Sequence, residues 1–344
     1  MFSLFARQGP STARVNGEPI TVLPKETLLQ AALRQGLAFP HSCRVGGCAS
    51  CKCRLLSGRV RELTETGYIL SAAELEQGYI LACQSVPKGD VSIEVDLSTQ
   101  QAQRQVEGRV LAQQPLTHDI IHLLVQLDES LAYKAGQYAN LSLASLPGIA
   151  RSYSFACPPQ ADGRVGFFVR KVPGGRFSSA IHEQNLVGQR LSLEGPLGDF
   201  WLRPAAAPLL LVAGGSGLAP ILAMLQEALA AGTTRSVTLL FGARQMRDLY
   251  ALEELGSIAA QWPGRFRFVP VLSEARDEGD WQGARGLVTE HLVSALEPGA
   301  HAYLCGPPGM IDIATALLHG QGVAQAHIHA DRFTSAQDVP SVTA

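Results

Sequence analysis

Five of the seven cysteines in this chain lie between Cys43 and Cys83. Three of them, Cys43, Cys48 and Cys51, follow C-x4-C-x2-C spacing, and Cys83 lies on a later segment. Four thiolates arranged in this way, three from one tight loop and one from a distant segment, hold a [2Fe–2S] cluster. Two glycines inside the loop suit this use, because glycine tolerates positive φ angles and close backbone approach. The spacing predicts that Cys43, Cys48, Cys51 and Cys83 are the metal ligands.

Other uses of these cysteines fit the spacing less well. A zinc site usually pairs one C-x2-C with a second such pair or with histidines, and the sequence offers no second pair. His41 suggests a Rieske-type centre, but such a centre needs two histidines near the cysteines. Cys53 lies two residues beyond Cys51, where the loop cannot easily offer it as a ligand. We expect Cys53 to be a structural thiol.

Length, charge and cysteine usage narrow the class of protein. A chain of 344 residues is long enough for two or three domains. A net charge of −2 gives no electrostatic reason to expect nucleic acid or an anionic membrane as a partner. An odd number of clustered cysteines does not resemble a secreted disulfide framework, and the N-terminus lacks the basic and apolar regions of a signal peptide. We expect a cytoplasmic protein, and a monomer.

One uncharged stretch, from Pro204 to Gln226, is long enough to span a bilayer. Gly214, Gly215, Gly217 and Pro220 interrupt it. Such breaks are typical of a strand, a glycine loop and a helix in a soluble α/β unit. The stretch therefore does not predict a membrane span.

The first hundred residues alternate short strands with two helical segments. We expect a hairpin with an Asn16-Gly17 turn, two helices and two further strands, the last of which closes the sheet. With the cysteines, residues 1–97 resemble a plant-type ferredoxin, a β-grasp sheet with one helix packed across it. A polar stretch over residues 98–105 predicts a linker. The expected segments are Arg14–Val22, Pro24–Leu33, Leu55–Val60, Ser71–Glu74 and Val91–Leu97.

Residues 106–204 show short strands parted by turns, which predicts an antiparallel six-stranded β-barrel. Period-two alternation places Arg151 and Tyr153 on one side of their strand and Ser154 on the other. A Gly174-Gly175 turn then leads into a helix, whose free N–H groups can bind phosphate. The six expected strands are Val106–Leu111, Ile120–Leu127, Gln137–Leu143, Arg151–Ala156, Gly166–Val172 and Arg190–Glu194.

The order of these motifs, together with Gly195-Pro196-Leu197-Gly198, resembles the FAD domain of the ferredoxin–NADP reductase superfamily. The resemblance implies that Arg151 contacts the FAD pyrophosphate and that Tyr153 packs on the isoalloxazine. It also implies that Ser154 hydrogen-bonds near the reactive flavin nitrogen and has a catalytic role. The remaining FAD-binding positions that it implies are Val169, Arg170, Gly175, Phe177 and Ser178.

Residues 205–335 alternate strands with helices, which predicts a parallel α/β sheet with ligands at the carboxyl ends of its strands. An apolar strand, a Gly214–Gly217 loop and a helix make a dinucleotide-phosphate site. The G-x-G-x-x-G fingerprint fails, however, because Pro220 stands at its third glycine position. The expected strands are Pro208–Ala213, Val237–Leu240, Phe266–Leu272 and His301–Cys305, and the expected helices are Leu218–Ala231, Leu249–Ala260, Thr289–Leu296 and a segment after Met310.

The glycine loop and Tyr303-Leu304-Cys305-Gly306-Pro307-Pro308 resemble the NAD(P) domain of the same superfamily. The resemblance implies that Cys305 lies beside the nicotinamide carbon that gives up hydride, and that Phe333, on a last strand Ile328–Phe333, approaches the flavin. Arg244 and Arg247 suit the 2′-phosphate of NADPH, whereas Asp248 suits the free ribose of NADH. Arg247-Asp248-Leu249-Tyr250 resembles the corresponding segment of NADH-using oxygenase reductases, and this resemblance implies NADH. Residues 336–344 are expected to be a tail. The implied NAD-binding positions are Gly214, Gly215, Gly217, Pro220, Gly242, Arg244, Asp248, Cys305, Gly306, Pro307 and Met310.

The order ferredoxin, FAD barrel and NAD domain resembles reductase components of bacterial aromatic-ring-hydroxylating dioxygenases, which serve aromatic hydrocarbon catabolism. The resemblance implies hydride transfer from NADH to FAD, single-electron transfer to the cluster, and delivery to an oxygenase directly or through a separate ferredoxin. A reductase of a di-iron monooxygenase or of deoxysugar biosynthesis has a related design. A non-catalytic redox sensor is a rival of another class, although a sensor needs no hydride-accepting apparatus.

Overall fold

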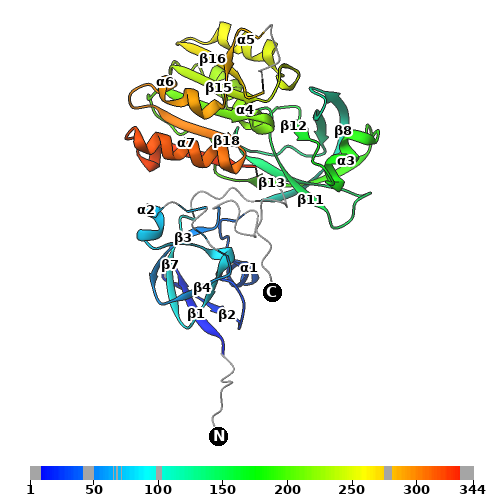
Figure 1. The fold of residues 1–344 in the computed structure, drawn as a ribbon. Coiled ribbons are helices and arrows are strands. Elements are labelled where there is room, and N and C mark those ends of the chain that lie inside the picture. Colours follow the sequence, from blue (N-terminus) through cyan, green and yellow to red (C-terminus); the bar gives the residue numbers. More distant parts are fainter. Residues whose placement is uncertain are drawn as a thin grey trace. The chain divides into compact units, whose positions relative to one another are not determined.

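The computed structural model describes residues 9–41, 50–64, 66, 69–70, 72–97, 103–274 and 281–333 (Figure 1). They fall into two compact units. One unit holds the described residues up to 97, and the other runs from Gln103 to the end of the described chain. The predicted cluster ligands Cys43 and Cys48 lie outside the described residues, as do Ser71 and the tail at 336–344.

The first unit is a five-stranded sheet of order β2-β1-β7-β3-β5 with a separate β4-β6 pair. Its helix α1 buries Leu28, Leu29, Ala31 and Ala32, a spacing that turns one helical face to the core. The plant-type ferredoxin architecture predicted from the cysteines is therefore present. Its elements are β1 Ser11–Val15, β2 Glu18–Val22, α1 Leu28–Arg34, β3 Lys52–Ser57, β4 Val60–Glu62, α2 Ala72–Glu76, β5 Tyr79–Leu81, η2 Ala82–Gln84, β6 Ser85–Pro87 and β7 Val91–Glu94.

Two local predictions for this unit were wrong. Helix α1 begins at Leu28 and not at Pro24, because Thr27 and Gln30 form a capping box there and Lys25 has a φ of 69°. Strand β7 does not close the sheet. It lies in the middle, pairing in parallel with β1 and antiparallel with β3.

The second unit begins with the six predicted antiparallel strands, in the order β11-β10-β13-β8-β9-β12. A bridge between Phe155 and Phe167 joins the two ends, so the barrel is nearly closed. Strand β8 starts at Arg104, inside the predicted linker, and pairs there with β13. The elements are β8 Arg104–Pro115, β9 Ile120–Leu127, β10 Tyr138–Leu143, β11 Ala150–Ser154, β12 Arg164–Arg170, α3 Arg176–Glu183 and β13 Arg190–Leu197.

The rest of this unit is a parallel sheet of order β17-β16-β15-β14-β18-β19, as the strand–helix alternation predicted. The helix expected at Thr289–Leu296 is broken into a 3₁₀ turn and one short helix. The elements are β14 Leu209–Gly214, η3 Gly215–Gly217, α4 Leu218–Ala230, β15 Val237–Ala243, η4 Met246–Asp248, α5 Leu252–Gln261, β16 Phe266–Leu272, β17 Ala284–Arg285, η6 Val288–His291, α6 Leu292–Ala295, β18 His301–Gly306, α7 Pro308–Gly320, η7 Gln325–His327 and β19 Ile328–Arg332.

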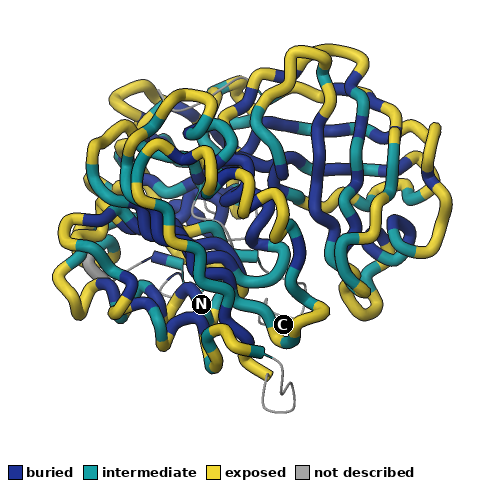
Figure 2. Tube along the Cα trace, turned by 90° about the horizontal axis from the view of Figure 1, so that it is seen from above, coloured by how far each residue is buried: buried dark blue, intermediate teal, exposed yellow. Residues whose placement is uncertain are grey.

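Helices cover both faces of the parallel sheet. Helices α4 and α5 share one apolar cluster with it, and α6 and α7 share a second cluster on the other face. The first cluster also takes in Ile120, Phe168 and Phe200 from the barrel region, so these residues pack the barrel against the sheet, while the barrel interior forms a cluster of its own. Figure 2 shows the buried residues concentrated in the interior of the trace and most exposed residues in the outer loops.

The uncharged stretch from Pro204 to Gln226 folds into β14, a glycine loop and most of α4. Helix α4 has 13 residues. Within the described ranges, none of the helices combines the length and the apolar character needed to cross a bilayer.

Candidate functional site

The described half of the cluster site brings two distant cysteines together. Cys51 lies just before β3 and Cys83 lies in the 3₁₀ turn η2. The backbone N–H of Cys83 donates to the Cys51 sulfur at 3.4 Å, and the N–H of Ala82 donates to the Cys51 carbonyl oxygen at 3.0 Å. Two cysteines from distant segments, with an N–H directed at one sulfur, supply half of the four-thiolate donor set that a [2Fe–2S] cluster requires. The residues present fit the group, and Cys51 and Cys83 are proposed as two of its ligands.

Cys53 lies in the core of the same unit, where its side chain is 1% exposed. Burial raises the pKa of the Cys53 thiol to about 12, with a smaller contribution from the charge of Cys83. A thiol with such a pKa stays protonated near neutral pH. These observations support the prediction of a structural thiol.

The FAD-binding positions predicted on the barrel lie on three neighbouring elements. Tyr153 of β11 packs beside Phe177 of α3, with ring centroids 5.7 Å apart. Burial raises the pKa of Tyr153 above its usual value, so this ring is a neutral, apolar surface. Ser154 is buried next to Tyr153, whereas Arg151 is exposed. An exposed cation on the same strand as an aromatic face suits a flavin with its pyrophosphate.

The turn before α3 is held by its own side chains. The Ser178 hydroxyl accepts the Val172 N–H at 3.1 Å and donates to the Gly175 carbonyl oxygen at 3.2 Å. A Cβ atom at Gly175 would lie 2.7 Å from the Ser178 hydroxyl, so only glycine fits this N-cap position. His182 of α3 contacts the Val169 carbonyl oxygen at 2.9 Å. The Ser178 hydroxyl thus stabilises the turn, and the contact with a flavin phosphate that we proposed would use this same hydroxyl.

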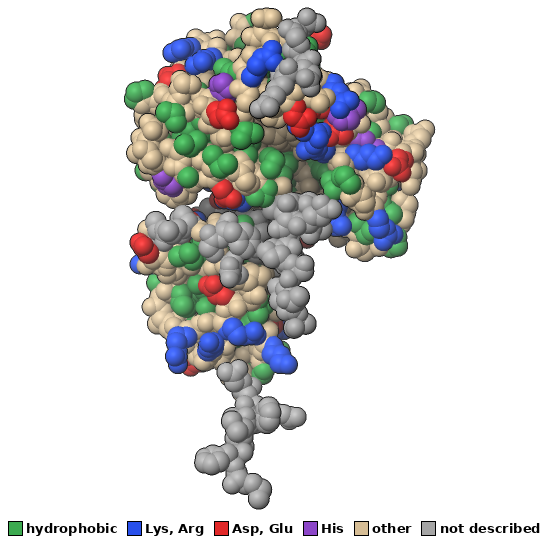
Figure 3. Space-filling view, in the orientation of Figure 1, with side chains coloured by type: hydrophobic (Ala, Val, Ile, Leu, Met, Phe, Trp, Pro, Cys, Tyr) green, Lys and Arg blue, Asp and Glu red, His purple; other side chains and the backbone are tan. Residues whose placement is uncertain are grey.

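A cavity of about 440 Å³ lies at the carboxyl ends of the parallel strands, where the sequence predicted the nucleotide. Figure 3 shows a hollow in this unit with basic, acidic and histidine side chains gathered at its rim. Several predicted residues line the cavity, and the structure adds others from the barrel and from η6. The predicted nucleotide-binding ones are Gly214, Gly215, Gly242, Arg244, Asp248, Pro307 and Met310, and Arg170, predicted to bind FAD, also lines the cavity. The added ones include Asp119 and Ile120 of the barrel, Ser273 after β16, Leu287 and Thr289 at η6, and Ile313 of α7.

Two glycines of the cavity wall lie close to neighbouring side chains. A Cβ atom at Gly214 would lie 2.8 Å from the Met310 sulfur, and one at Gly242 would lie 3.0 Å from Val288. Gly217 lies outside the wall and packs on β18, where a Cβ atom would be 2.3 Å from the Cys305 carbonyl oxygen. Pro220 is buried inside α4. Gly217 and Pro220 thus seat the helix and do not line the cavity.

An ion-pair network joins the barrel to the parallel sheet beside this cavity. Asp119 pairs with Arg170 at 2.9 Å and with Arg244 at 3.5 Å. Asp248 pairs with Arg244 at 3.6 Å and lies 3.4 Å from His118. Burial alone would raise the pKa of Asp119, but the hydrogen bond and charge of Arg170 outweigh it and hold this pKa below its usual value. His118 and the two carboxylates are close enough to hold a metal ion, yet both guanidinium groups already supply counter-charge.

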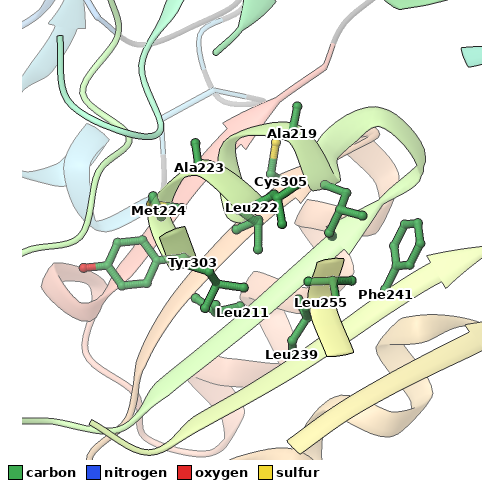
Figure 4. Packing of buried hydrophobic residues seen from close by; sticks show 14 of the residues in the cluster. Leu211, Ala219, Leu222, Ala223, Met224, Leu239, Phe241, Leu255, Tyr303 and Cys305 are labelled. Carbon is green, nitrogen blue, oxygen red and sulfur yellow. The ribbon is translucent and has the colours of Figure 1, made fainter. Parts of the chain in front are cut away.

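Cys305 and Phe333 lie beside the cavity region but not in its wall. Cys305 is the next-to-last residue of β18, and its side chain is fully buried near Ala219 of α4 (Figure 4). Burial raises the pKa of the Cys305 thiol well above its usual value, and the nearby Asp331 adds to this effect. Phe333 packs against the same apolar cluster, and its N–H donates to the Gly306 carbonyl oxygen at 2.9 Å. A role for Cys305 and Phe333 in hydride transfer stays a prediction.

Sequence reasoning missed the barrel's share of the nucleotide cavity. Asp119 lies two residues after Thr117. The Thr117 hydroxyl donates to the Asp119 carboxylate and accepts the Ile120 N–H, as threonine often does in turns. Tyr250 was also missed, although its hydroxyl donates to the Gly215 carbonyl oxygen at 2.9 Å and so fixes the glycine loop. An aspartate just after a threonine in a turn and a tyrosine just before a helix are common in sequences, so neither pattern by itself indicates a ligand site.

Three family models match successive parts of the chain. A 2Fe-2S iron-sulfur cluster binding domain matches residues 13–88. An oxidoreductase FAD-binding domain matches residues 107–201, and an oxidoreductase NAD-binding domain matches residues 211–316. The predicted cofactors, a [2Fe–2S] cluster, FAD and a nicotinamide nucleotide, are therefore confirmed as the groups that these domains bind.

Relatives match almost the full length. The electron transfer component of the xylene/toluene monooxygenase of Pseudomonas putida is 44% identical over 96% of this chain and 95% of its own. The chain belongs to the ferredoxin-fused reductase components of oxygenase systems. The reductase component of a naphthalene 1,2-dioxygenase system of Pseudomonas putida is 37% identical over 89% of this reductase and 93% of its own length. A crystal structure of the Amycolatopsis cytochrome P450 reductase GcoB matches with a TM-score of 0.76 and 35% identity, covering 95% of this chain and 99% of that one.

These matches settle the class of activity. The protein is an NAD(P)H-dependent oxidoreductase of electron transport, and it acts with an oxygenase partner. The relatives include monooxygenase and dioxygenase reductases, so the family spans both kinds of oxygenase. The rival hypothesis of a non-catalytic redox sensor finds no support among them.

Proposed function

We propose that this reductase uses NADH and passes electrons through FAD and its cluster to the oxygenase of an aromatic-hydrocarbon monooxygenase. The observation that carries the proposal is the 44% identity to the xylene/toluene monooxygenase component. A phenol 2-monooxygenase reductase of a Pseudomonas species, 37% identical over 95% of the chain, supports the same class. The chain then delivers electrons and does not itself touch the hydrocarbon.

An aromatic-ring dioxygenase is the second candidate partner, and it is the one that the sequence favoured. The naphthalene dioxygenase reductase and a toluate 1,2-dioxygenase electron transfer component, 36% identical over 90% of the chain, support it. In either case the oxygenase is expected to receive electrons directly or through a separate ferredoxin. The two candidates share every step up to the cluster.

The residues of the second unit have distinct proposed duties. The cavity at the carboxyl ends of β14, β15 and β18 would hold the nicotinamide nucleotide, with Gly214 and Gly215 against its phosphates. Tyr153 and Phe177 would bound the flavin, and Arg151 would neutralise its pyrophosphate. When bound, FAD accepts the hydride pair and releases electrons singly. The apolar cluster shared by a few barrel residues and the sheet supports a fixed spacing between the two proposed sites.

The choice of NADH rests on the charges beside the cavity. Arg244, one of the two arginines proposed for a 2′-phosphate, lines the cavity, but it is already paired with Asp119 and Asp248. A 2′-phosphate would have to compete with these two carboxylates and would be repelled by them. The free ribose hydroxyls of NADH can instead donate to a carboxylate. This arrangement supports NADH.

Two measurements test the proposal. The ratio of kcat/KM for NADH to that for NADPH, with cytochrome c as a one-electron acceptor, is expected to exceed ten; a ratio below one contradicts the choice of NADH. Reconstitution with a purified xylene- or phenol-type hydroxylase and, separately, with a naphthalene-type dioxygenase is expected to give coupled product with the first partner. Coupled turnover only with the dioxygenase would replace the first candidate by the second.

A further inference from the structure

Gln84, the residue after the predicted ligand Cys83, is one of the few polar side chains buried in the described part of the ferredoxin unit, at 6% exposure. Its amide Nε2 lies 3.5 Å from the Cys83 sulfur and donates to it. A buried primary amide is costly unless its donors and acceptor find partners. Here one donor is directed at a sulfur that would be a thiolate ligand.

We propose that Gln84 is a positioning residue that raises the reduction potential of the [2Fe–2S] cluster through its hydrogen bond to the Cys83 sulfur. Reduction adds one negative charge to the cluster and its sulfurs. A neutral N–H donor therefore stabilises the reduced form more than the oxidised form. The proposal rests on the assignment of Cys83 as a ligand.

Neighbouring segments hold the backbone of Gln84 in place. The backbone carbonyl oxygen of Gln84 accepts the Leu63 N–H at 2.8 Å, and η2 packs against α1. The next residue, Ser85, is fully buried and donates its hydroxyl to the Leu81 carbonyl oxygen at 2.9 Å. These contacts fix the backbone from which the buried Gln84 side chain reaches the Cys83 sulfur. A cluster at higher potential is a better acceptor for electrons from the flavin.

The test compares Gln84→Leu with the matched control Ser85→Ala in the full-length holoprotein. Leucine keeps the size and the backbone hydrogen bonds but removes the donor, whereas Ser85→Ala removes a neighbouring buried hydrogen bond that does not touch sulfur. We expect Gln84→Leu to lower the one-electron reduction equilibrium constant of the cluster by threefold to thirtyfold, about 30 to 90 mV at 59 mV per tenfold. Ser85→Ala is expected to leave it within twofold, and both variants to keep wild-type reduction of FAD by NADH.

An EPR-monitored potentiometric measurement gives the result. An unchanged midpoint in Gln84→Leu, or an equal shift in Ser85→Ala, would overturn the proposal. If Gln84→Leu fails to assemble a cluster, wild-type protein labelled with ¹⁵N only in glutamine side-chain amides supplies a second test. Electron spin echo of the reduced cluster should then show a ¹⁵N coupling, and its absence would also overturn the proposal. Retention of an unchanged cluster in Cys83→Ala, which offers no ligand atom at this position, would refute the ligand assignment itself.

Discussion

Gly217 provides a sharp test of how the nucleotide cavity is built. A Cβ atom at this position would lie 2.3 Å from the Cys305 carbonyl oxygen, 2.7 Å from its carbonyl carbon and 3.0 Å from the Gly306 nitrogen. All three are backbone atoms of β18 and its end, so no side chain can move aside. Restoring ordinary contact in Gly217→Ala requires α4 and the end of β18 to separate by about 1 Å.

This displacement has two expected costs. Overpacking of a close-packed core destabilises by about 1 to 3 kcal/mol, and the backbone contact places Gly217→Ala at the upper end of that range. The displaced segment also carries the glycine loop, and a misplacement of about 1 Å at a reacting site can lower a rate by about 100-fold. We therefore expect a loss of about 3 kcal/mol in unfolding free energy, together with FAD reduction by NADH slowed by about 100-fold.

Urea unfolding followed by flavin fluorescence and anaerobic stopped-flow reduction of FAD measure the two effects. Gly256→Ala is the matched control, because Gly256 lies in α5 and a Cβ atom there would meet nothing within 4 Å beyond its own stretch of helix. That change is expected to stabilise the helix by about 1 kcal/mol and to leave the reduction rate unaltered. If Gly217→Ala behaved like Gly256→Ala in both assays, the packing argument for the cavity would be refuted.

Three further outcomes are expected. Cys53→Ala should keep the visible and EPR spectra of the cluster and lose about 1 kcal/mol of stability; loss of the cluster would make Cys53 a ligand. Asp119→Asn removes the carboxylate that pairs with Arg170 and Arg244, so kcat/KM for NADPH relative to NADH should rise several-fold, and an unchanged ratio would count against the charge argument. Burial lowers the pKa of His329 to about 4, so its contribution to stability is complete above about pH 6.5 and is lost as pH falls toward 4. The free energy of unfolding, measured with urea, should therefore fall less between pH 7 and pH 5 in His329→Phe than in the wild type. Equal falls would refute this role of His329.

The sequence predicted the architecture well because its signals were local and periodic. The six barrel strands and the β14, β15, β16 and β18 strands were found from alternation or continuous apolar runs, which directly reflect which faces are buried. The Asn16-Gly17 hairpin was predicted because this residue pair favours the positive φ angles of a tight hairpin turn, and both residues adopt such angles in the structure. Element type was thus accessible wherever one short segment carried the whole signal.

The errors arose where a signal other than hydrophobic periodicity decides the local structure. The start of α1 is set by the Thr27–Gln30 capping box, which competes with several possible starts upstream. The central position of β7 depends on its pairing with β1, at the other end of the unit's chain. No periodicity in either segment encodes such a choice.

The residues of the candidate site were likewise predictable only where a local pattern placed them. Gly214, Gly242 and Met310 were predicted because they follow strands, and the carboxyl ends of parallel strands meet at one edge. Asp119 was not, because it reaches the cavity through the packing of the barrel on the sheet. The burial of Cys305 likewise depends on α4 lying across β18, which its strand-end position does not reveal.

The central claim is an internal electron path from the nicotinamide nucleotide through FAD to the cluster. Anaerobic addition of NADH to the full-length holoprotein, followed by visible absorbance and by EPR of rapidly frozen samples, tests it most directly. The account predicts bleaching of the flavin first and then the EPR signal of a reduced [2Fe–2S] cluster. A flavin fully reduced by NADH beside a cluster that stays oxidised, although dithionite reduces it, would contradict the account.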